Sequence, residues 1–268
     1  MNIYTNLYLT NKCYIIYTMF NIKITIQYDG TNFYGWQIQP NLRTIQGEIY
    51  KAVEKVYYKK STIYGCGRTD AGVHALGQVA NFKVEKMLVP IERVHIALNS
   101  CLPKDIRIIK AELMPDDFNS RASATFREYI YVIYNADISS PFYEKYAWFY
   151  RKNIINEELI NKYSEYLLGE HNFTSFCSTE DENDSKYRYI ERAYAIRKKD
   201  FVYFIIRGNA FLHNMVRIIV GTLIEGQRKK EPLDFIKEII KKENRAEAFI
   251  TAPPYGLYFR KALFSNIN

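Results

Sequence analysis

The chain has few of the residues that build metal centres and disulfide frameworks. Its 268 residues include four cysteines and four histidines, and no two cysteines have the Cys-x-x-Cys spacing of a metal knuckle. It also lacks a secretory signal, the Gly-x-x-x-x-Gly-Lys-Ser/Thr pattern of a P-loop, and any apolar run of about 18 residues that could cross a membrane. We therefore expect reduced thiols in a cytoplasmic protein without a bound metal, a nucleotide cofactor or a membrane segment.

The chain is instead rich in tyrosine and in positive charge. It has 24 tyrosines, and 37 Lys and Arg residues against 29 Asp and Glu residues leave a net charge of +8. Cations bind phosphates and aromatic rings stack on bases, so this composition is compatible with an RNA-binding protein. A genome poor in G and C also enriches tyrosine, lysine, isoleucine and asparagine, and composition alone does not separate the two explanations. The 48% of apolar residues indicates a folded chain in either case.

Apolar periodicity divides the chain into strands and helices. Alternation predicts strands over residues 22–28, 77–84, 106–114, 126–135, 188–209 (two strands joined by a Lys-Lys-Asp turn) and 256–264. Helical spacing predicts helices over residues 44–60, 90–103, 156–170, 210–226 and 232–249, with N-caps at Thr44 and Asn156 and an exit at Gly169. Because strands, hairpins and helices alternate in both halves, we expect an α+β fold with mixed, largely antiparallel sheets.

The first 18 residues do not fit this pattern. They are rich in Tyr, Asn and Thr and have neither the apolar core nor the cleavage site of a signal peptide. Met19 follows directly and opens the first predicted strand. We hypothesise that Met19 is the true start and that residues 1–18 are a translated leader.

One glycine-rich segment, "YGCGRTDAGVHALGQ" at residues 64–78, surrounds a single carboxylate, Asp70. A strained turn in which Asp70 caps its own backbone is the simpler interpretation of the segment alone. Glycines also let a backbone approach a ligand closely, and Arg68 could then hold a phosphate or a base. His74 lies four residues after Asp70, but no further ligands cluster near the two, so we expect a structural histidine rather than a metal ligand.

Three residues further along the chain can belong either to the hydrophobic core or to a functional site, and they are Arg217, Tyr129 and Tyr131. Arg217 lies in the otherwise apolar "NMVRIIVGTLI", where a charge either reaches solvent or needs a carboxylate partner. An arginine buried beside an aspartate keeps that aspartate ionised, and Asp70 is a candidate partner. Tyr129 and Tyr131 share one face of a predicted strand, either as core aromatics or as a ring that stacks on a base and has its hydroxyl free for proton transfer.

The run "GCGRTDAGVHALGQVANF" at residues 65–82 closely resembles the signature of the bacterial TruA family of tRNA pseudouridine synthases. Seven further segments that resemble the family follow its order: "YDGTNFYGWQ", "TIQGEI", "LPKDI", "FNSRASATFREYIYVIYN", "GEHNFTSF", "NAFLHNMVRIIVGTL" and "APPYGLYF". The resemblance covers residues 20–264. Asn119 and Ala122 depart from it, because His and an aromatic residue are common at these places in the family, and local RNA contacts would differ there.

This resemblance implies the fold, the activity and the partners. The fold would be two RRM-like α+β domains, residues 19–118 and 119–268, that join their sheets into one extended sheet with the catalytic cleft between them. The activity would be isomerisation of uridine to pseudouridine at positions 38, 39 and 40 of the tRNA anticodon stem–loop, without a cofactor or a metal. The protein would bind tRNA as a homodimer.

The resemblance also assigns roles to five residues. Asp70 would be the catalytic carboxylate, as nucleophile or as base, and Arg217 would form an ion pair with it. Tyr129 would stack on the target uracil and act as a proton acceptor. Arg68 would help to flip the base, and Leu257 would line the same pocket. The roles of His74 and His213 stay open.

Two alternatives belong to other classes of protein. A non-catalytic RNA-binding protein on the same fold would keep the basic and aromatic surface, but it would not need the set Asp70, Tyr129 and Arg217. A glycoside hydrolase usually needs two acidic residues that flank the bond, and the motifs contain no such pair.

Overall fold

A single sheet of ten strands runs through the computed structural model, which describes residues 19–181 and 183–265. The predicted leader, residues 1–18, lies outside the described residues. The strands are β1 (Phe20–Tyr28), β2 (Tyr64–Gly65), β3 (His74–Val84), β4 (Ile106–Met114), β5 (Ala124–Tyr134), β6 (Trp148–Phe149), β7 (Gly169–Asn172), β8 (Tyr187–Lys198), β9 (Phe201–Gly208) and β10 (Leu257–Phe264).

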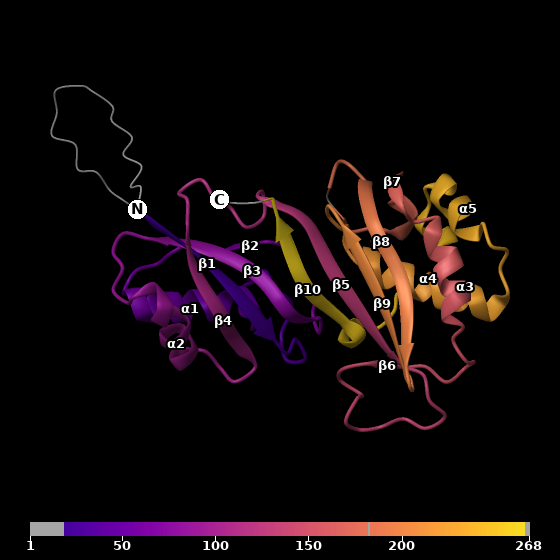
Figure 1. Ribbon diagram of the computed structural model, residues 1–268, viewed down its shortest axis with the longest axis horizontal. Helices are drawn as coiled ribbons and strands as arrows, with labels where there is room; N and C mark the ends of the chain where they lie inside the picture. Colours follow the sequence, from indigo (N-terminus) through magenta and orange to yellow (C-terminus); the bar gives the residue numbers. More distant parts are fainter. Residues whose placement is uncertain (1–18, 182, 266–268) are drawn as a thin grey trace.

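The sheet is mixed and largely antiparallel, as the sequence predicts. Its order is β4-β1-β3-β10-β5-β9-β8-β7, while β2 pairs with β3 and β6 pairs with β5. The pairs β10–β3 and β5–β6 are parallel, and the others are antiparallel. In Figure 1 the sheet extends along the long axis of the molecule, with β10 near its middle.

Five α-helices form two groups at opposite ends of the sheet. They are α1 (Ile45–Tyr57), α2 (Ile91–Cys101), α3 (Glu157–Glu165), α4 (Met215–Lys229) and α5 (Phe235–Lys242). Figure 1 shows α1 and α2 beside β1 and β4, and α3, α4 and α5 beside β8 and β9. The predicted N-caps are present, because Thr44 accepts from the backbone of Gly47 and Asn156 from that of Leu159. Within the described residues, no helix is long and apolar enough to span a bilayer.

Strand alternation gives the sheet two different faces. In β1 the side chains of Ile22, Ile24 and Ile26 are fully buried, while Lys23 and Thr25 between them point the other way. β5 likewise buries Tyr129, Tyr131 and Ile133, and it leaves Ile130, Val132 and Tyr134 partly exposed. We call the buried side, where the helices pack, the helix face, and the opposite side the open face.

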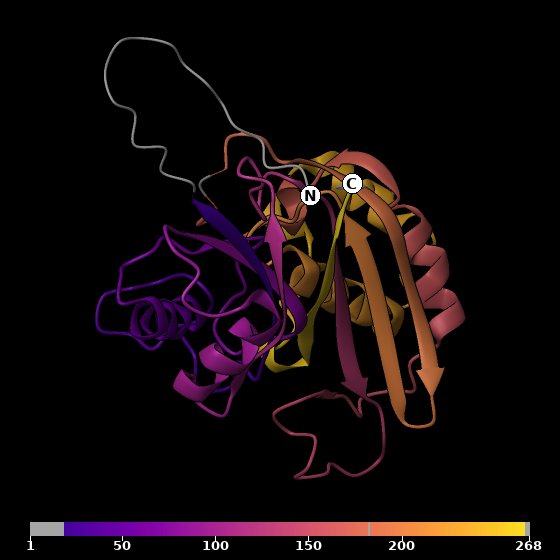
Figure 2. The same cartoon turned by 60° about the vertical axis from the view of Figure 1, so that its left-hand side comes forward.

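The last strand of the described chain joins the two halves of the sheet. β10 pairs in parallel with β3, where Tyr258 lies opposite His74, and antiparallel with β5, where Phe259 lies opposite Tyr129. Figure 2 shows β10 passing between the strands of the two halves. The predicted division at residues 118 and 119 falls between β4 and β5, and it stays a prediction.

Several helix boundaries differ from those predicted, and the largest difference is the end of α5 at Lys242 rather than at residue 249. α4 begins at Met215 rather than at residue 210, because Asn214 has a left-handed backbone (φ 61°) that a helix cannot continue through. Gly169 does not end α3, which stops at Glu165; it opens β7 with a φ of 94°. Neither residue could be assigned from apolar spacing, since both boundaries depend on single backbone dihedrals.

Candidate active site

The loop after β1 holds the turn that carries Asp70. The backbone N–H of Trp36 donates to the carbonyl of Thr69 (3.0 Å), and the hydroxyls of Tyr28 and Thr69 hydrogen-bond (2.8 Å). Gly35 adopts a φ of 84°, and a Cβ atom there would lie 2.7 Å from the Thr69 carbonyl oxygen. Only glycine fits this approach, so the aromatic "YGWQ" loop serves to fix the turn beneath Asp70.

The carboxylate of Asp70 faces an arginine and a histidine from the second half of the chain. Its Oδ2 lies 3.0 Å from Nη1 of Arg217, and its Oδ1 lies 3.7 Å from Nε2 of His213. In the described residues, no backbone N–H of its own turn donates to it, so the simpler interpretation of the sequence, a capped turn, is wrong. The side chain is 27% exposed, which leaves it within reach of a substrate.

Arg217 points into the protein rather than snorkelling to solvent. It is the third residue of α4, and its side chain is 15% exposed. Its Nε donates to the carbonyl of Ala252 (2.8 Å), and its Nη1 donates to Oδ1 of Asn214 (2.7 Å) as well as to Asp70. Three acceptors therefore fix the plane of the guanidinium group.

The ring of Tyr129 lies near this ion pair and packs against two other aromatic side chains. Phe211 and Phe259 each pack edge-on against its ring, with centroids 5.1 Å away. Burial raises the pKa of Tyr129 well above its ordinary value, and nearby ionisable groups, including Asp70, raise it further. The hydroxyl is therefore protonated at neutral pH. A Cβ atom on Gly67 would lie 3.8 Å from this hydroxyl, so the glycine-rich segment passes beside the hydroxyl end of the ring.

The two remaining predicted site residues differ in exposure. Arg68 is exposed, and it forms no ion pair with any residue that the structure describes. Its guanidinium group is thus available to an anionic ligand. Leu257 is 5% exposed at the start of β10, opposite Tyr131 and two residues before Phe259. It shares a face with Phe259, which packs against Tyr129.

His74 lies on the other side of the sheet from Asp70 and has a structural role. Its ring stacks on Tyr258, with centroids 4.7 Å apart, and its Nε2 faces the Lys145 carbonyl (2.9 Å). Its Nδ1 accepts from the N–H of Gly30 (3.0 Å), so the Asp29 carboxylate 3.2 Å away does not form an ion pair with it. Burial lowers the pKa of His74, in agreement with a neutral ring. Residues 19–181 and 183–265 contain no group of three or more His, Cys, Asp or Glu residues that could hold a metal.

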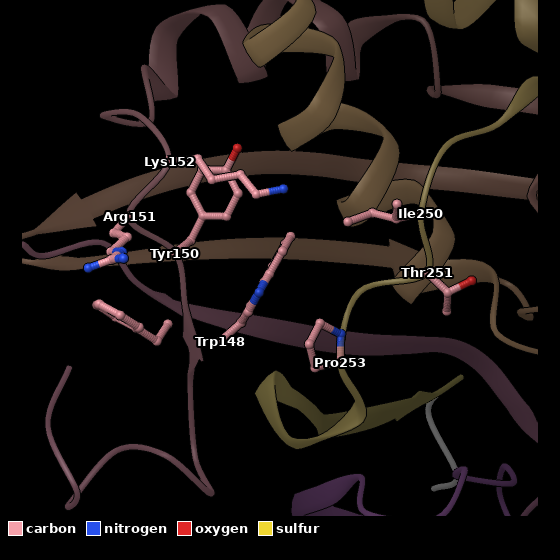
Figure 3. Close-up of a pocket in the computed structure, with 8 residues that line it drawn as sticks. Trp148, Tyr150, Arg151, Lys152, Ile250, Thr251 and Pro253 are labelled. Atoms are coloured by element: carbon pink, nitrogen blue, oxygen red, sulfur yellow. The ribbon is translucent and has the colours of Figure 1, made fainter. Parts of the chain in front are cut away.

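Residues 250–256, here called the strap, contact side chains in and around the site through their backbone carbonyl oxygens. Ala252 accepts from Arg217, Pro253 accepts from the Tyr131 hydroxyl (2.8 Å), and Tyr255 lies 3.1 Å from Nε2 of His74. A hollow, that is, a surface pocket, lies between the strap and residues 148–152. Figure 3 shows Trp148, Tyr150, Arg151 and Lys152 across from Ile250, Thr251 and Pro253. None of the predicted site residues lines this hollow, which is separate from the candidate site.

The segment before α4 supplies residues that the sequence did not single out. Phe211 packs on Tyr129, and Asn214 bonds Arg217, while His213, whose role was open, faces Asp70. The spacing contained a signal for Asn214, because a residue three positions before Arg217 can meet its side chain. What apolar spacing does not contain is the left-handed backbone of Asn214, which places residues 210–214 outside α4.

Comparisons with known proteins agree on one family. The model of the tRNA pseudouridine synthase family matches residues 24–121 and 164–265. The chain is 76% identical over 248 residues to the tRNA pseudouridine synthase A of Brachyspira hyodysenteriae, a match that covers 92% of this chain and all of the relative. It is 42% identical to the protein of the same name from Caldicellulosiruptor bescii, over 90% of this chain and 98% of the relative.

A solved structure is also similar in part. The crystal structure of a Cbf5-Nop10-Gar1 complex aligns with 74% of this chain and 52% of its own, at 10% identity and a TM-score of 0.33. That similarity is too low to carry an argument about the site.

Proposed function

The chain belongs to the TruA family of tRNA pseudouridine synthases, isomerases that act on uridine in tRNA, and from this premise we propose that it modifies positions 38, 39 and 40 of the anticodon stem–loop with Asp70 as the catalytic carboxylate. The observation that carries the proposal is the 3.0 Å contact between Asp70 and Arg217, two residues that lie 147 positions apart. Residues 19–118 would contribute the acid and residues 119–268 its partner, so the site forms only when the two units meet. The protein acts in the cytoplasm and needs no cofactor.

The reaction needs one ionised carboxylate beside the ribose. The bond between C1′ and N1 breaks, the uracil turns while it stays bound, and C5 then bonds to C1′ and gives up its proton, while N1 gains one. Asp70 either attacks C1′, to be displaced later by C5, or removes the 2′ proton so that a glycal forms and returns that proton when C5 bonds to C1′. Both routes use the same carboxylate, and Arg217 places its positive charge at hydrogen-bond distance from it.

Tyr129 serves this reaction as a stacking surface for the uracil. Its raised pKa argues against a phenolate that takes the C5 proton, because the hydroxyl keeps its own proton at neutral pH. Its ring lies near Asp70 and its hydroxyl end lies beside Gly67, where a flipped base would enter. Leu257, on the same face of β10 as Phe259, completes the apolar side of the pocket.

Arg68 assists the base in leaving the stem–loop. Unstacking a base costs a few kcal/mol, which contacts to the RNA backbone must offset. Arg68 is exposed two residues before Asp70, where its cation can bind a phosphate next to the target nucleotide. The net charge of +8 provides the more distant phosphate contacts.

The open face supports the homodimer that the resemblance implies. Across β9, Tyr203 lies opposite both Val132 of β5 and Ile196 of β8, and Ile196 is 41% exposed. Tyr134 and Phe201 continue this apolar surface, with their rings 5.0 Å apart. Apolar strand surface of this kind favours coverage by a partner, and a second copy offers the same surface around a two-fold axis.

Mapping pseudouridine in undermodified tRNA after treatment with this protein tests the proposed target. We expect new pseudouridine at positions 38, 39 and 40, and none when these positions carry cytidine. Product at other positions would contradict the anticodon assignment, and no product at all would contradict the proposed site.

The mass of the protein in solution tests the dimer. We expect sedimentation to give twice the chain mass for the wild type and one chain mass for Ile196→Asp, because a carboxylate would be buried unpaired in the interface. The matched control is Ile154→Asp, an exposed position between β6 and α3 that should leave the mass unchanged. A monomeric wild type would remove the proposal.

A further inference from the structure

Asn214 occupies a helix N-cap position but does not cap the helix. It directly precedes α4, where an asparagine side chain normally accepts from the backbone N–H two or three residues on. No such hydrogen bond is present at α4. Asn156, at the same position before α3, caps its helix in the usual way by accepting from Leu159. The side chain of Asn214 is thus diverted from the ordinary task of its position.

The diverted side chain binds the arginine of the ion pair. Oδ1 of Asn214 accepts from Nη1 of Arg217 at 2.7 Å, and the same nitrogen donates to Asp70 at 3.0 Å. A guanidinium Nη carries two hydrogens, and these two acceptors use both. The carbonyl of Ala252 holds Nε at 2.8 Å. Asn214 therefore removes the freedom of Nη1 to turn away from Asp70.

The backbone of Asn214 is suited to this contact. Its φ of 61° and ψ of 3° place it in the left-handed region, which asparagine tolerates better than other residues with a side chain. Asparagine thus combines a tolerated left-handed turn with a short acceptor, which glycine and alanine do not.

The preceding residue is anchored from outside the helix. The N–H of His213 donates to Oδ2 of Asp181 (2.7 Å), and its carbonyl accepts from Ser178 (3.0 Å). Burial would raise the pKa of Asp181, but hydrogen bonds, the largest from Lys186, outweigh it and hold this pKa far below its ordinary value. The permanent charge of Asp181 therefore fixes the segment from which Asn214 reaches Arg217.

We propose that Asn214 is a positioning residue, which orients the guanidinium group of Arg217 toward Asp70 through its left-handed backbone and its side-chain oxygen. This inference rests on the proposed function, since it assigns Asn214 to the pair that the reaction uses. Asn214 itself touches neither the substrate nor the reacting atoms. It acts only through Arg217.

Three substitutions at Asn214 separate the backbone from the side chain. Asn214→Gly keeps the left-handed turn and removes the acceptor, Asn214→Asp keeps an acceptor oxygen, and Asn214→Ala removes both features. In single-turnover reactions with saturating enzyme, we expect the rate constant to fall about 10-fold for Asn214→Gly, with the Kd for tRNA unchanged. We expect Asn214→Asp to recover most of that rate, and Asn214→Ala to lose a further 2–4 °C of Tm, an order-of-magnitude shift for a chain of this size.

Asn156→Gly is the matched control, because it removes a true cap from a helix away from the ion pair. We expect a lower Tm and an unchanged rate constant for it. A wild-type rate for Asn214→Gly, or a loss in Asn214→Asp as large as in Asn214→Gly, would overturn the positioning role. Either result leaves the proposed function intact if the wild type still makes pseudouridine and Asp70→Asn does not.

A double-mutant cycle with Arg217→Lys tests the route of the effect. A lysine offers one nitrogen on a flexible stem, so it lacks the planar group that the Ala252 carbonyl and Asn214 hold in one orientation. If Asn214 acts through Arg217, the cost of Asn214→Gly should shrink to about 2-fold or less in the Arg217→Lys background. Full additivity of the two costs would contradict the proposal, and it would do so even if both single variants were slow.

Discussion

Strand β5 carries two ion clusters on its two faces, one beside Tyr129 and one at Glu128. On the open face, Glu128 is 2% exposed and accepts from Arg207 (2.8 Å) and Arg260 (2.7 Å), with Lys261 at 3.9 Å. On the helix face, Asp70 is 27% exposed and has one arginine at hydrogen-bond distance. Two carboxylates thus pair with arginines beside neighbouring residues of β5, on opposite faces of the sheet and with different exposure.

The difference lies in how much of each carboxylate remains available. Both oxygens of Glu128 are engaged by arginines, and the group is out of reach of solvent, so it can stabilise the sheet but not attack a ligand. Oδ2 of Asp70 is bound by Arg217, while Oδ1 has only His213 at 3.7 Å. A reactive carboxylate thus needs enough positive charge to stay ionised and few enough partners to keep one oxygen free.

Replacing the carboxylate of Asp70 should have the largest effect. Asp70→Asn removes the anion without changing the shape of the turn, so we expect a fall of about 10⁴-fold in pseudouridine formation and little change in tRNA binding. The matched control is Asp116→Asn, whose carboxylate is 74% exposed and pairs with Lys83 on the surface. Full product from Asp70→Asn would end the assignment of this residue.

Removing the partner of Asp70 should cost both activity and stability. Arg217→Ala leaves Asp70, Asn214 and the Ala252 carbonyl without their donor, so we expect the rate to fall about 10²–10³-fold and the free energy of unfolding to fall by about 2 kcal/mol. Arg197→Ala is the control, since Arg197 forms its own ion pair with Glu157. If turnover and thermal midpoint of Arg217→Ala both matched the wild type, the ion-pair argument would be wrong.

The Glu128 cluster should give the opposite pattern. Glu128→Gln leaves Arg207 and Arg260 beside a neutral group in a buried place, so we expect the free energy of unfolding to fall by about 3 kcal/mol. Once corrected for the folded fraction, the rate at saturating tRNA should change by less than about 3-fold, because Glu128 does not reach the helix face. Denaturant unfolding and single-turnover kinetics measure the two quantities. If the corrected rate fell by more than about 3-fold, the distinction between the two clusters would be lost.

The smallest effect should come from His74, which lies on the open face. Burial lowers its pKa in the fold, whereas an unfolded chain has an ordinary imidazole with a pKa of about 6.5. Below that pH the unfolded state binds more protons, so stability is complete above about 6.5 and declines as the pH falls. We expect the wild type to lose about 1 kcal/mol more than His74→Gln between pH 7 and pH 5. Parallel stability curves for the two proteins would contradict a neutral, buried His74.

Much of the fold was accessible from sequence because its signals are local. The β8–β9 hairpin could be predicted from a Lys-Lys-Asp turn between two alternating runs, and Lys199 in that turn has the left-handed φ (54°) of a tight connection. The N-caps at Thr44 and Asn156 are likewise encoded within four residues. The position of β10 between β3 and β5 has no such signal, since its partners are about 130 and 180 residues away in the chain.

In the site, too, features encoded by neighbouring residues could be predicted, and features that depend on the folded backbone could not. A single charge in an apolar helix marked Arg217 as a residue that either reaches solvent or needs a carboxylate, and the contact with Asp70 decides for the second. The sequence could not reveal that the left-handed turn at Asn214 delays the start of the predicted helix and directs Asn214 and His213 to the pair. It also could not show that Asp70 and His74, four residues apart, face opposite sides of the sheet, because the chain changes from a turn to a strand between them.

The sheet cannot be completed before β10 has been translated, because β10 lies inside it. The strand lies in the middle of the sheet, yet its residues follow those of every other strand described. Until they leave the ribosome, β5 and the His74 end of β3 each present an unpaired edge, and such edges recruit other chains into aggregates. The strap that holds Arg217 is made immediately before β10. A nascent chain therefore pairs these exposed strand edges and assembles the Asp70–Arg217 pair in the same late step.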